Sequence, residues 1–168
     1  MRRVSSRPLF GIAAAVCAAL LGYAYYLEHV VGLEPCPLCL VQRGFFYALT
    51  AVFALAALHG PGRGGTLAYA TLAGIFALGG AGVAGRQVWL QHLPPDKVPA
   101  CGPDLYFMME HFPLAQTLRT LFTGTGECAV VDWTFLRLSI AEWSLAWFAA
   151  LLAFAVAIAW KGNSGSGS

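Results

Sequence analysis

The sequence predicts an all-α membrane protein, a bundle of four transmembrane helices with two loops on its outer side. Three observations predict this fold. Of the 168 residues 58% are hydrophobic and 11% are charged, whereas soluble domains carry roughly a quarter charged residues. Four apolar segments are long enough to cross a hydrocarbon core of roughly 30 Å. All the acidic side chains also fall in two of the connections, whereas the termini and the remaining turn carry only basic ones. We expect one domain over residues 1–161, followed by a Gly/Ser-rich expression linker over 162–168.

The first predicted span covers residues 9–27, contains no charged side chain and follows an arginine-rich N-terminus. Such a segment could be a signal-like sequence. Its far end, however, carries Tyr23, Tyr25 and Tyr26, which are typical of the aromatic belt at a membrane interface. We therefore interpret it as a transmembrane helix.

The second predicted span covers residues 41–58, and the Gly/Pro-rich residues 60–65 end it in a tight turn. The third span covers residues 66–90 and is rich in Gly and Ala. Small side chains let helix backbones approach closely, so this helix is expected to pack inside the bundle. The fourth span, residues 143–160, has a tryptophan at each end.

Two outer loops, residues 28–40 and 92–142, join these spans. Within the longer loop, residues 112–122 place apolar side chains on one helical face. This pattern predicts a short amphipathic helix lying on the bilayer surface.

The distribution of charge orients the bundle. All eight carboxylate side chains lie in the two outer loops. The termini and the turn between the second and third spans carry only basic residues, which are Arg2, Arg3, Arg7, Arg63 and Lys161. The positive-inside rule then predicts that both termini are cytosolic and that the two loops face outward, where disulfides persist.

Four of the five cysteines lie in the outer loops, as the pairs Cys36/Cys39 and Cys101/Cys128. Structural disulfides are one interpretation, but a ring closed over two residues stabilises a fold little, and such rings are more often redox-active. A zinc site needs four converging thiolates, and the wide spacing of the second pair is unlike a zinc ribbon, so we expect no metal. Cys17 falls mid-span and is expected to be a small buried hydrophobe.

Arg43 lies one helical turn after Cys39, on the same predicted face. This cation and the positive end of the second helix are expected to stabilise the reactive thiolate of Cys39. A dithiol at a membrane edge beside a cation indicates electron transfer between thiols and a lipid-soluble acceptor. The alternative is that Arg43 only extends to the lipid headgroups.

Gln87, Trp89 and His92 end the third span near the same outer edge. Donors and an aromatic ring beside an apolar cleft could hold a quinone headgroup, with its tail in lipid. The alternative for His92 is an ordinary interfacial histidine.

The chain resembles the disulfide bond formation protein B (DsbB) family of bacterial inner-membrane thiol oxidases over nearly its whole length. The residues that carry the resemblance are Glu34-Pro35-Cys36-Pro37-Leu38-Cys39, Arg43, Gln87 to His92, Cys101, Cys128-Ala129, Trp133 and Phe135. Members often have an acidic residue before the arginine, where this chain has Gln42. Vitamin K epoxide reductase-like enzymes also combine four helices, a dithiol and a quinone, but place their Cys-x-x-Cys in a later helix.

The resemblance implies that the protein reoxidises a periplasmic thioredoxin-fold oxidase of the DsbA type. That partner attacks a Cys101–Cys128 disulfide, and electrons pass to Cys36 and Cys39, with a transient Cys36–Cys128 bridge as one route. The final acceptor is a quinone, either ubiquinone or menaquinone. The expected quinone contacts are Arg43, Gln87, His92 and Trp133. The protein is expected to be a monomer that binds no nucleic acid; a four-helix scaffold with inert disulfides is the non-enzyme alternative.

Overall fold

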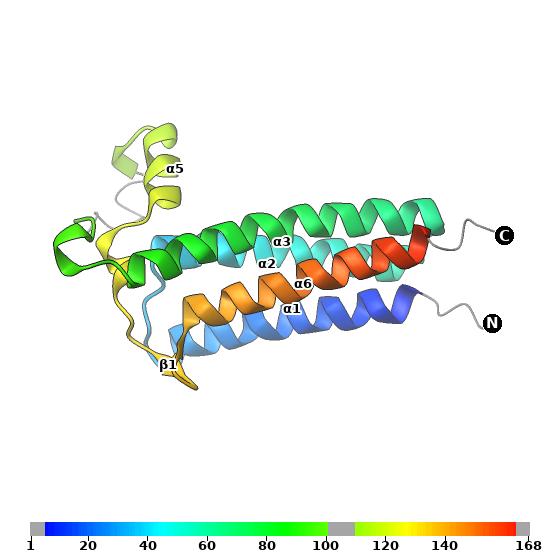
Figure 1. Ribbon diagram of the computed structural model, residues 1–168, viewed down its shortest axis with the longest axis horizontal. Coiled ribbons are helices and arrows are strands. Elements are labelled where there is room, and N and C mark those ends of the chain that lie inside the picture. Colours follow the sequence, from blue (N-terminus) through cyan, green and yellow to red (C-terminus); the bar gives the residue numbers. More distant parts are fainter. Residues whose placement is uncertain (1–5, 101–109, 164–168) are drawn as a thin grey trace.

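Four long helices run side by side in a computed structural model of the chain, which describes residues 6–100 and 110–163 (Figure 1). They are α1 (Ser6–His29), α2 (Pro37–His59), α3 (Arg63–Gln91) and α6 (Ile140–Asn163). Each is long and apolar enough to cross a membrane. The four-helix prediction is therefore confirmed. The start of α1 and the end of α6 lie at the same end of the bundle (Figure 1).

Short elements gather at the opposite end of the bundle. They are the 3-10 turns η1 (Pro95–Lys97) and η2 (Gly126–Ala129), the helix α5 (Leu114–Thr123), and the strands β1 (Thr134–Phe135) and β2 (Leu138–Ser139). The helix α5 occupies most of the predicted amphipathic segment, and its contact with a bilayer stays a prediction. The antiparallel β1–β2 hairpin is a feature that the hydrophobic pattern did not indicate.

The helix α2 begins at Pro37, inside the segment expected to be a loop. Proline suits the first helical position because its φ is already helical and its missing N–H has no partner there anyway. Cys36 is the extended N-cap residue, and Cys39 lies in the first helical turn. The dithiol is thus fixed on a rigid helix end.

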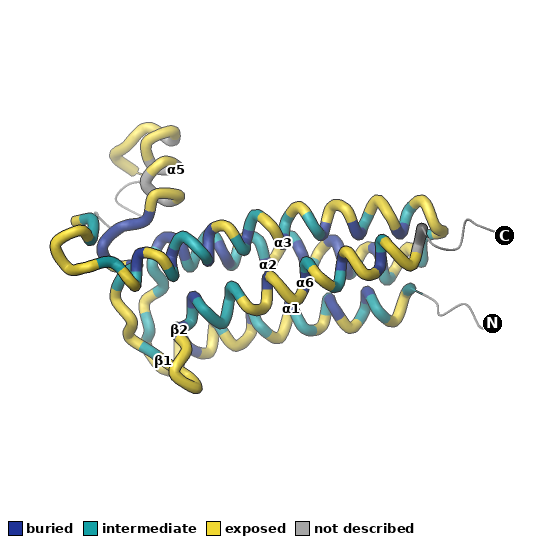
Figure 2. Tube along the Cα trace, in the orientation of Figure 1, coloured by how far each residue is buried: buried dark blue, intermediate teal, exposed yellow. Residues whose placement is uncertain are grey.

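Close packing of α3 depends on its small residues. Alanines at 70, 73, 77 and 84 are buried against the neighbouring helices. A side chain at Gly80 would have its Cβ 2.3 Å from the ring of Phe148, which itself stacks on Phe46 at 4.2 Å between centroids. The prediction that α3 packs inside the bundle is borne out, and exposed residues lie mainly on the outer helix faces (Figure 2).

The four helices do not contact one another equally. The most extensive contacts join α1 to α2, α2 to α3, and α3 to α6. The seam between α1 and α6 is the loosest of the four. Residues of both helices line a cavity at the end of the bundle that carries Cys39.

Candidate redox site

Cys36 and Cys39 lie three residues apart at the N-terminus of α2, with their sulfur atoms 3.0 Å from each other. The extended backbone of Cys36 and the helical backbone of Cys39 turn both side chains toward the same point. Both residues are half-buried. The two thiols are placed to form or break a disulfide with only a small movement of their side chains.

Cys128 in η2 is the third sulfur of the site and is fully buried. Gly124 allows this approach, because its φ of +80° suits glycine and a Cβ there would meet Leu38 and Leu90. The loop therefore folds tightly against the ends of α2 and α3.

In this structure Cys36 and Cys128 are free thiols, and Cys36 packs against the buried cluster that contains Cys128, so that its thiol can donate a hydrogen bond to the Cys128 sulfur. This bond lowers the pKa of Cys128 to about 6, with further donation from the backbone at Leu38 and Thr125. The same bond is the largest cause of a raised pKa at Cys36. Cys36 therefore holds the proton, and Cys128 is the thiolate of the pair at neutral pH.

Two glutamine side chains lie behind the dithiol, and each is 3% exposed. Gln87 of α3 donates from Nε2 to the sulfurs of Cys36 and Cys39, at 3.3 Å in both cases. Gln42 of α2 donates from Nε2 to Oε1 of Gln87 at 2.6 Å. The dithiol is thus hydrogen-bonded to a buried amide pair that joins two helices.

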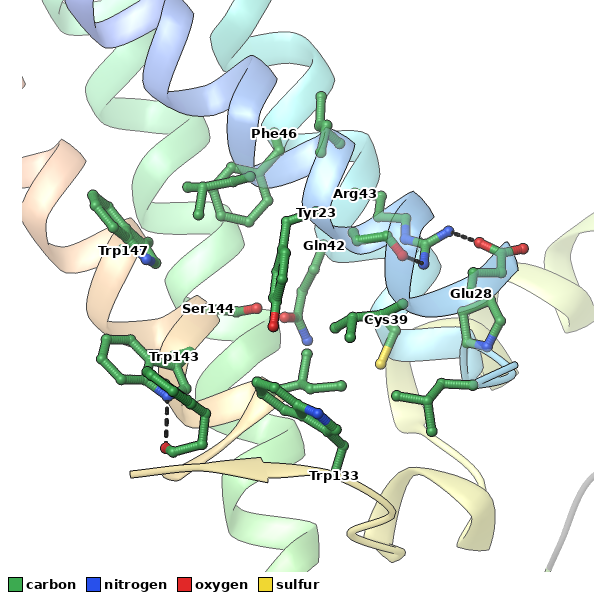
Figure 3. Close-up of a pocket in the computed structure, with 18 of the residues that line it drawn as sticks. Tyr23, Glu28, Cys39, Gln42, Arg43, Phe46, Trp133, Trp143, Ser144 and Trp147 are labelled. Atoms are coloured by element: carbon green, nitrogen blue, oxygen red, sulfur yellow. Dashed lines mark hydrogen bonds and ion pairs between the residues drawn. The ribbon is translucent and has the colours of Figure 1, made fainter. Parts of the chain in front are cut away.

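A cavity of about 480 Å³ opens beside Cys39, between α1, α2 and α6 (Figure 3). Its lining is mainly aromatic and aliphatic and includes Tyr23, Phe46, Trp133, Phe135, Trp143 and Trp147. The cavity is in the size range of small-molecule sites, which are concave, largely apolar and carry few polar groups.

The β1–β2 hairpin forms part of the wall of this cavity through Phe135. The indole N–H of Trp143 donates to the backbone oxygen of Phe135 at 3.0 Å, which ties the hairpin to α6 (Figure 3). Trp133 contacts the rings of Tyr23 and Phe135, with centroids 6.2 Å and 6.1 Å away. The aromatic wall is therefore built from α1, α2, α6 and the second loop together.

Arg43 contributes to the polar part of the cavity wall. Its guanidinium forms an ion pair with Glu28, donates to the backbone oxygen of Ala24 at 3.2 Å, and lies 5.1 Å from the ring centroid of Tyr25. Figure 3 shows the Arg43–Glu28 pair close to Cys39. These contacts to α1 hold the cation at the cavity edge, whereas headgroup contact alone would leave it free to move.

The other predicted site residues do not all lie at the cavity. Gln87 contacts the sulfurs and does not line the aromatic cavity. His92 is exposed, bonds from Nδ1 to the backbone oxygen of Val88 at 2.8 Å, and is not part of the cavity wall. Quinone contact by either residue stays a prediction. Cys101 lies outside the described residues, and Cys17 is buried in the core.

The sequence does not predict that Gln42, Trp147 and Phe135 contribute to the site, although Phe135 is one of the residues that carry the resemblance. Trp147 carried a usable signal, since it lies one helical turn after Trp143 and therefore on the same face. Within residues 6–100 and 110–163, no group of three or more His, Cys, Asp or Glu side chains is arranged to hold a metal ion.

Comparison with known proteins adds a second kind of observation. Residues 6–158 match the model of the family described as disulfide bond formation protein DsbB. The chain belongs to the DsbB family. It is therefore a membrane disulfide bond formation protein and a disulfide-forming oxidoreductase.

Curated members of the DsbB family match over nearly their whole length. The chain is 53% identical to disulfide bond formation protein B of Aromatoleum aromaticum, over 90% of this chain and 91% of that protein. It is 50% identical to the protein of the same name from Methylococcus capsulatus, over 94% and 96% of the two chains. It is 48% identical to disulfide bond formation protein B 1 of Pseudomonas aeruginosa, over 93% and 96%. Neither the structural scaffold nor the vitamin K epoxide reductase-like enzyme is better supported than membership of the DsbB family.

Proposed function

We propose that this protein takes electrons from a periplasmic thioredoxin-fold oxidase of the DsbA type and delivers them to a membrane quinone, ubiquinone or menaquinone. The proposed redox-active residues are Cys36, Cys39, Cys101 and Cys128. In this proposal the end of the bundle that carries both termini is cytosolic, and the end that carries the cysteines is periplasmic, as the charge distribution indicates.

The placement of Cys39 is the observation that carries the proposal. Cys39 borders the aromatic cavity of about 480 Å³, whereas its partner Cys36 is hydrogen-bonded to Cys128 of the second loop. One sulfur of the dithiol therefore faces a site suited to an apolar acceptor. The other faces the sulfur through which electrons arrive.

The cavity fits a quinone by its chemistry. A quinone ring is flat, apolar and rimmed by two carbonyl acceptors, and stacked aromatic side chains suit its faces. Trp133 and Trp143 supply such surfaces, and the guanidinium of Arg43 supplies a charged donor at the edge. When bound, a quinone accepts two electrons and two protons and so allows the dithiol to return to its disulfide.

The thiol steps follow from the order of the sulfurs. A thiolate of the partner attacks Cys101, the Cys101–Cys128 bond breaks, and the electron pair leaves on Cys128. The Cys128 thiolate then attacks Cys36, the Cys36–Cys39 bond breaks, and the electron pair moves to Cys39 beside the cavity. The second thiolate of the partner then displaces Cys101, which leaves the partner oxidised, and Cys101 in turn displaces Cys36 from Cys128.

Stabilisation of the Cys128 thiolate suits both of its roles. Donation from the backbone at Leu38 and Thr125 does not depend on the oxidation state of Cys36, and a thiol of lowered pKa leaves more readily when Cys101 is attacked. Cys128 leaves the broken disulfide as a thiolate, and the backbone donors at Leu38 and Thr125 stabilise that charge before it attacks Cys36. Cys36 packs against the buried cluster that contains Cys128, and this packing holds the loop sulfur close to Cys36 for that transfer.

The direct test mixes the purified full-length protein with a reduced thioredoxin-fold oxidase and a short-tailed quinone, and follows quinone absorbance. We expect the wild-type protein to reduce the quinone and Cys39→Ala to lose that activity. Cys17→Ala is the matched control, because Cys17 is a buried cysteine of α1 away from the cavity, and it should retain the wild-type rate.

Two results would contradict the proposal. One is quinone reduction by Cys39→Ala at the wild-type rate. The other is a wild-type protein whose cysteines stay oxidised and never exchange with the added reduced partner, which is the behaviour of a structural scaffold.

A further inference from the structure

A single side-chain amide contacts both sulfurs of the dithiol. Nε2 of Gln87 donates to Cys36 and to Cys39 at the same distance of 3.3 Å. A carboxamide carries two N–H donors on this nitrogen, so it can serve two acceptors at once. Whichever of the two sulfurs bears negative charge during exchange therefore already faces a donor.

A second hydrogen bond fixes the orientation of the Gln87 amide. A glutamine amide can rotate by half a turn and present its oxygen in place of its nitrogen. Gln42 donates to Oε1 of Gln87 at 2.6 Å, which favours the orientation with the nitrogen toward the sulfurs. The same oxygen lies 3.7 Å from the sulfur of Cys39, which can donate to it only while it is a protonated thiol. Because both glutamines are 3% exposed, water does not compete effectively for these bonds.

The two amides also line two different cavities beside the dithiol. Gln42 lines the large aromatic cavity, and Gln87 lines a smaller pocket of about 60 Å³ on the other side. Cys39 borders both cavities, whereas Cys36 borders only the smaller one. The ionisable groups around the sulfurs and the amides are Glu28, Glu34, Arg43, Glu127, Cys128 and Asp132.

We infer that Gln87 is a positioning residue for the dithiol, that it stabilises the thiolate form of Cys39 by direct donation, and that Gln42 acts through Gln87 by fixing its amide. This inference rests on the proposed function and gives Gln87 a role toward sulfur that differs from the predicted contact with a quinone. It identifies a function for the amide that this chain has at position 42.

The step that benefits is the transfer between the two disulfides. When the Cys128 thiolate attacks Cys36, the Cys36–Cys39 bond breaks and its electron pair goes to Cys39. The sulfur of Cys39 then carries a full negative charge in a half-buried place, where an unpaired charge is costly. Donation from Gln87 lowers that cost without any rearrangement, because the amide is already oriented.

The test measures the sulfurs without a quinone. The full-length protein in detergent, freed of quinone and reduced, is treated with iodoacetamide, and mass spectrometry follows the modification of Cys39. Alkylation needs the thiolate, so its rate reports the thiolate fraction. Because a hydrogen bond to a charged group is worth about ten-fold in an equilibrium, we expect Gln87→Leu to slow alkylation of Cys39 about ten-fold near neutral pH.

Gln91→Leu is the matched control. Gln91 lies one turn after Gln87 on α3 and borders the same small pocket, but its amide oxygen accepts from the hydroxyl of Ser139 at 2.8 Å. The control should leave the alkylation rate of Cys39 at the wild-type value. An equal loss in both variants would mean that any disturbance of this helix end slows the reaction, and it would overturn the inference.

A double-mutant cycle tests the role of Gln42. Gln42→Leu should slow alkylation in the same direction as Gln87→Leu, and the double variant should be no slower than Gln87→Leu alone, because Gln42 acts only through Gln87. Independent, multiplying effects would overturn the assignment of Gln42.

The same variants separate this inference from the proposed function. If Gln87→Leu alkylates normally but no longer reduces quinone, the amide contacts the quinone and the inference is wrong, while the proposed function stands. If the wild-type protein reduces no quinone but the alkylation series behaves as expected, the proposed function fails and the hydrogen bond to the sulfurs remains.

Discussion

Cys128 shows at the scale of one residue how the fold changes an ordinary side chain. Its pKa is lowered from 9.0 to about 6, with the hydrogen bond from Cys36 as the largest cause. A lowered pKa means that the thiolate predominates above pH 6 and is lost as the pH falls below it. Reactivity at Cys128 should therefore be retained at pH 7 and decline in mildly acidic solution.

We expect the alkylation rate of Cys128 in the reduced protein to reach half its plateau near pH 6. Removing the donor by Cys36→Ala should move that midpoint upward, toward the ordinary value of 9.0. The measurement is iodoacetamide labelling between pH 5 and about 9 with mass spectrometry of the Cys128 peptide. A midpoint that Cys36→Ala leaves in place would show that the hydrogen bond is not the cause.

Arg43 is the second residue whose role can be tested alone. Because its guanidinium lies at the cavity edge, Arg43→Ala should raise the KM for a short-tailed quinone about ten-fold, the loss expected for one charge-assisted hydrogen bond. Steady-state kinetics with quinone as the varied substrate measure this change.

Arg86→Ala is the control for Arg43. Arg86 also lies at the outer end of a span, but it packs over Trp89 at 4.3 Å and donates to the backbone oxygen of Thr123. Its removal should leave the KM for quinone unchanged. An equal rise in both variants would indicate a general effect of lost positive charge and would argue against a specific contact by Arg43.

Among the elements, α3 determines how closely the bundle can pack. Gly80→Ala would place a Cβ 2.3 Å from Phe148, and such overpacking costs about 1–3 kcal/mol. Gly82→Ala has open space around the new methyl group and should not destabilise the protein. Thermal unfolding in detergent, followed by circular dichroism, compares the two, and equal stabilities would show that α3 and α6 separate easily.

The hairpin β1–β2 illustrates why some elements escape sequence analysis. Its turn residues Leu136 and Arg137 have φ values of +52° and +66°, a region that favours Gly and Asn. The sequence therefore lacks the Asn-Gly type of signal on which a hairpin prediction depends. By contrast α5 was predictable, because its apolar residues recur at helical spacing within one continuous segment.

Sidedness is a property of the whole molecule. If both termini are cytosolic, a membrane-impermeant maleimide added to reduced spheroplasts should label Cys36 or Cys39. A protease should then remove the C-terminal tail from inverted vesicles but not from spheroplasts. Cys17, buried within α1, should stay unlabelled in both preparations and serves as the internal control. Labelling of the dithiol from the cytosolic side alone would reverse the proposed orientation.

The number of spans, their approximate ends and the segregation of charge follow from the sequence by itself. The reason is that crossing a bilayer requires a continuous apolar segment, and orientation depends on basic residues next to it, so both are local properties of the chain. The predictions that the cysteine pairs lie on one side of the membrane and that Arg43 acts beside Cys39 also depend only on local sequence.

Only the tertiary structure decided which distant side chains meet. Cys128 reaches Cys36 because Gly124 lets the second loop pack onto the ends of α2 and α3. The aromatic cavity lies where α1 and α6, which make few contacts with each other, face one another, and Gln42 meets Gln87 because α2 packs against α3. Each of these contacts depends on the relative placement of helices far apart in sequence, which no periodicity within a single segment specifies.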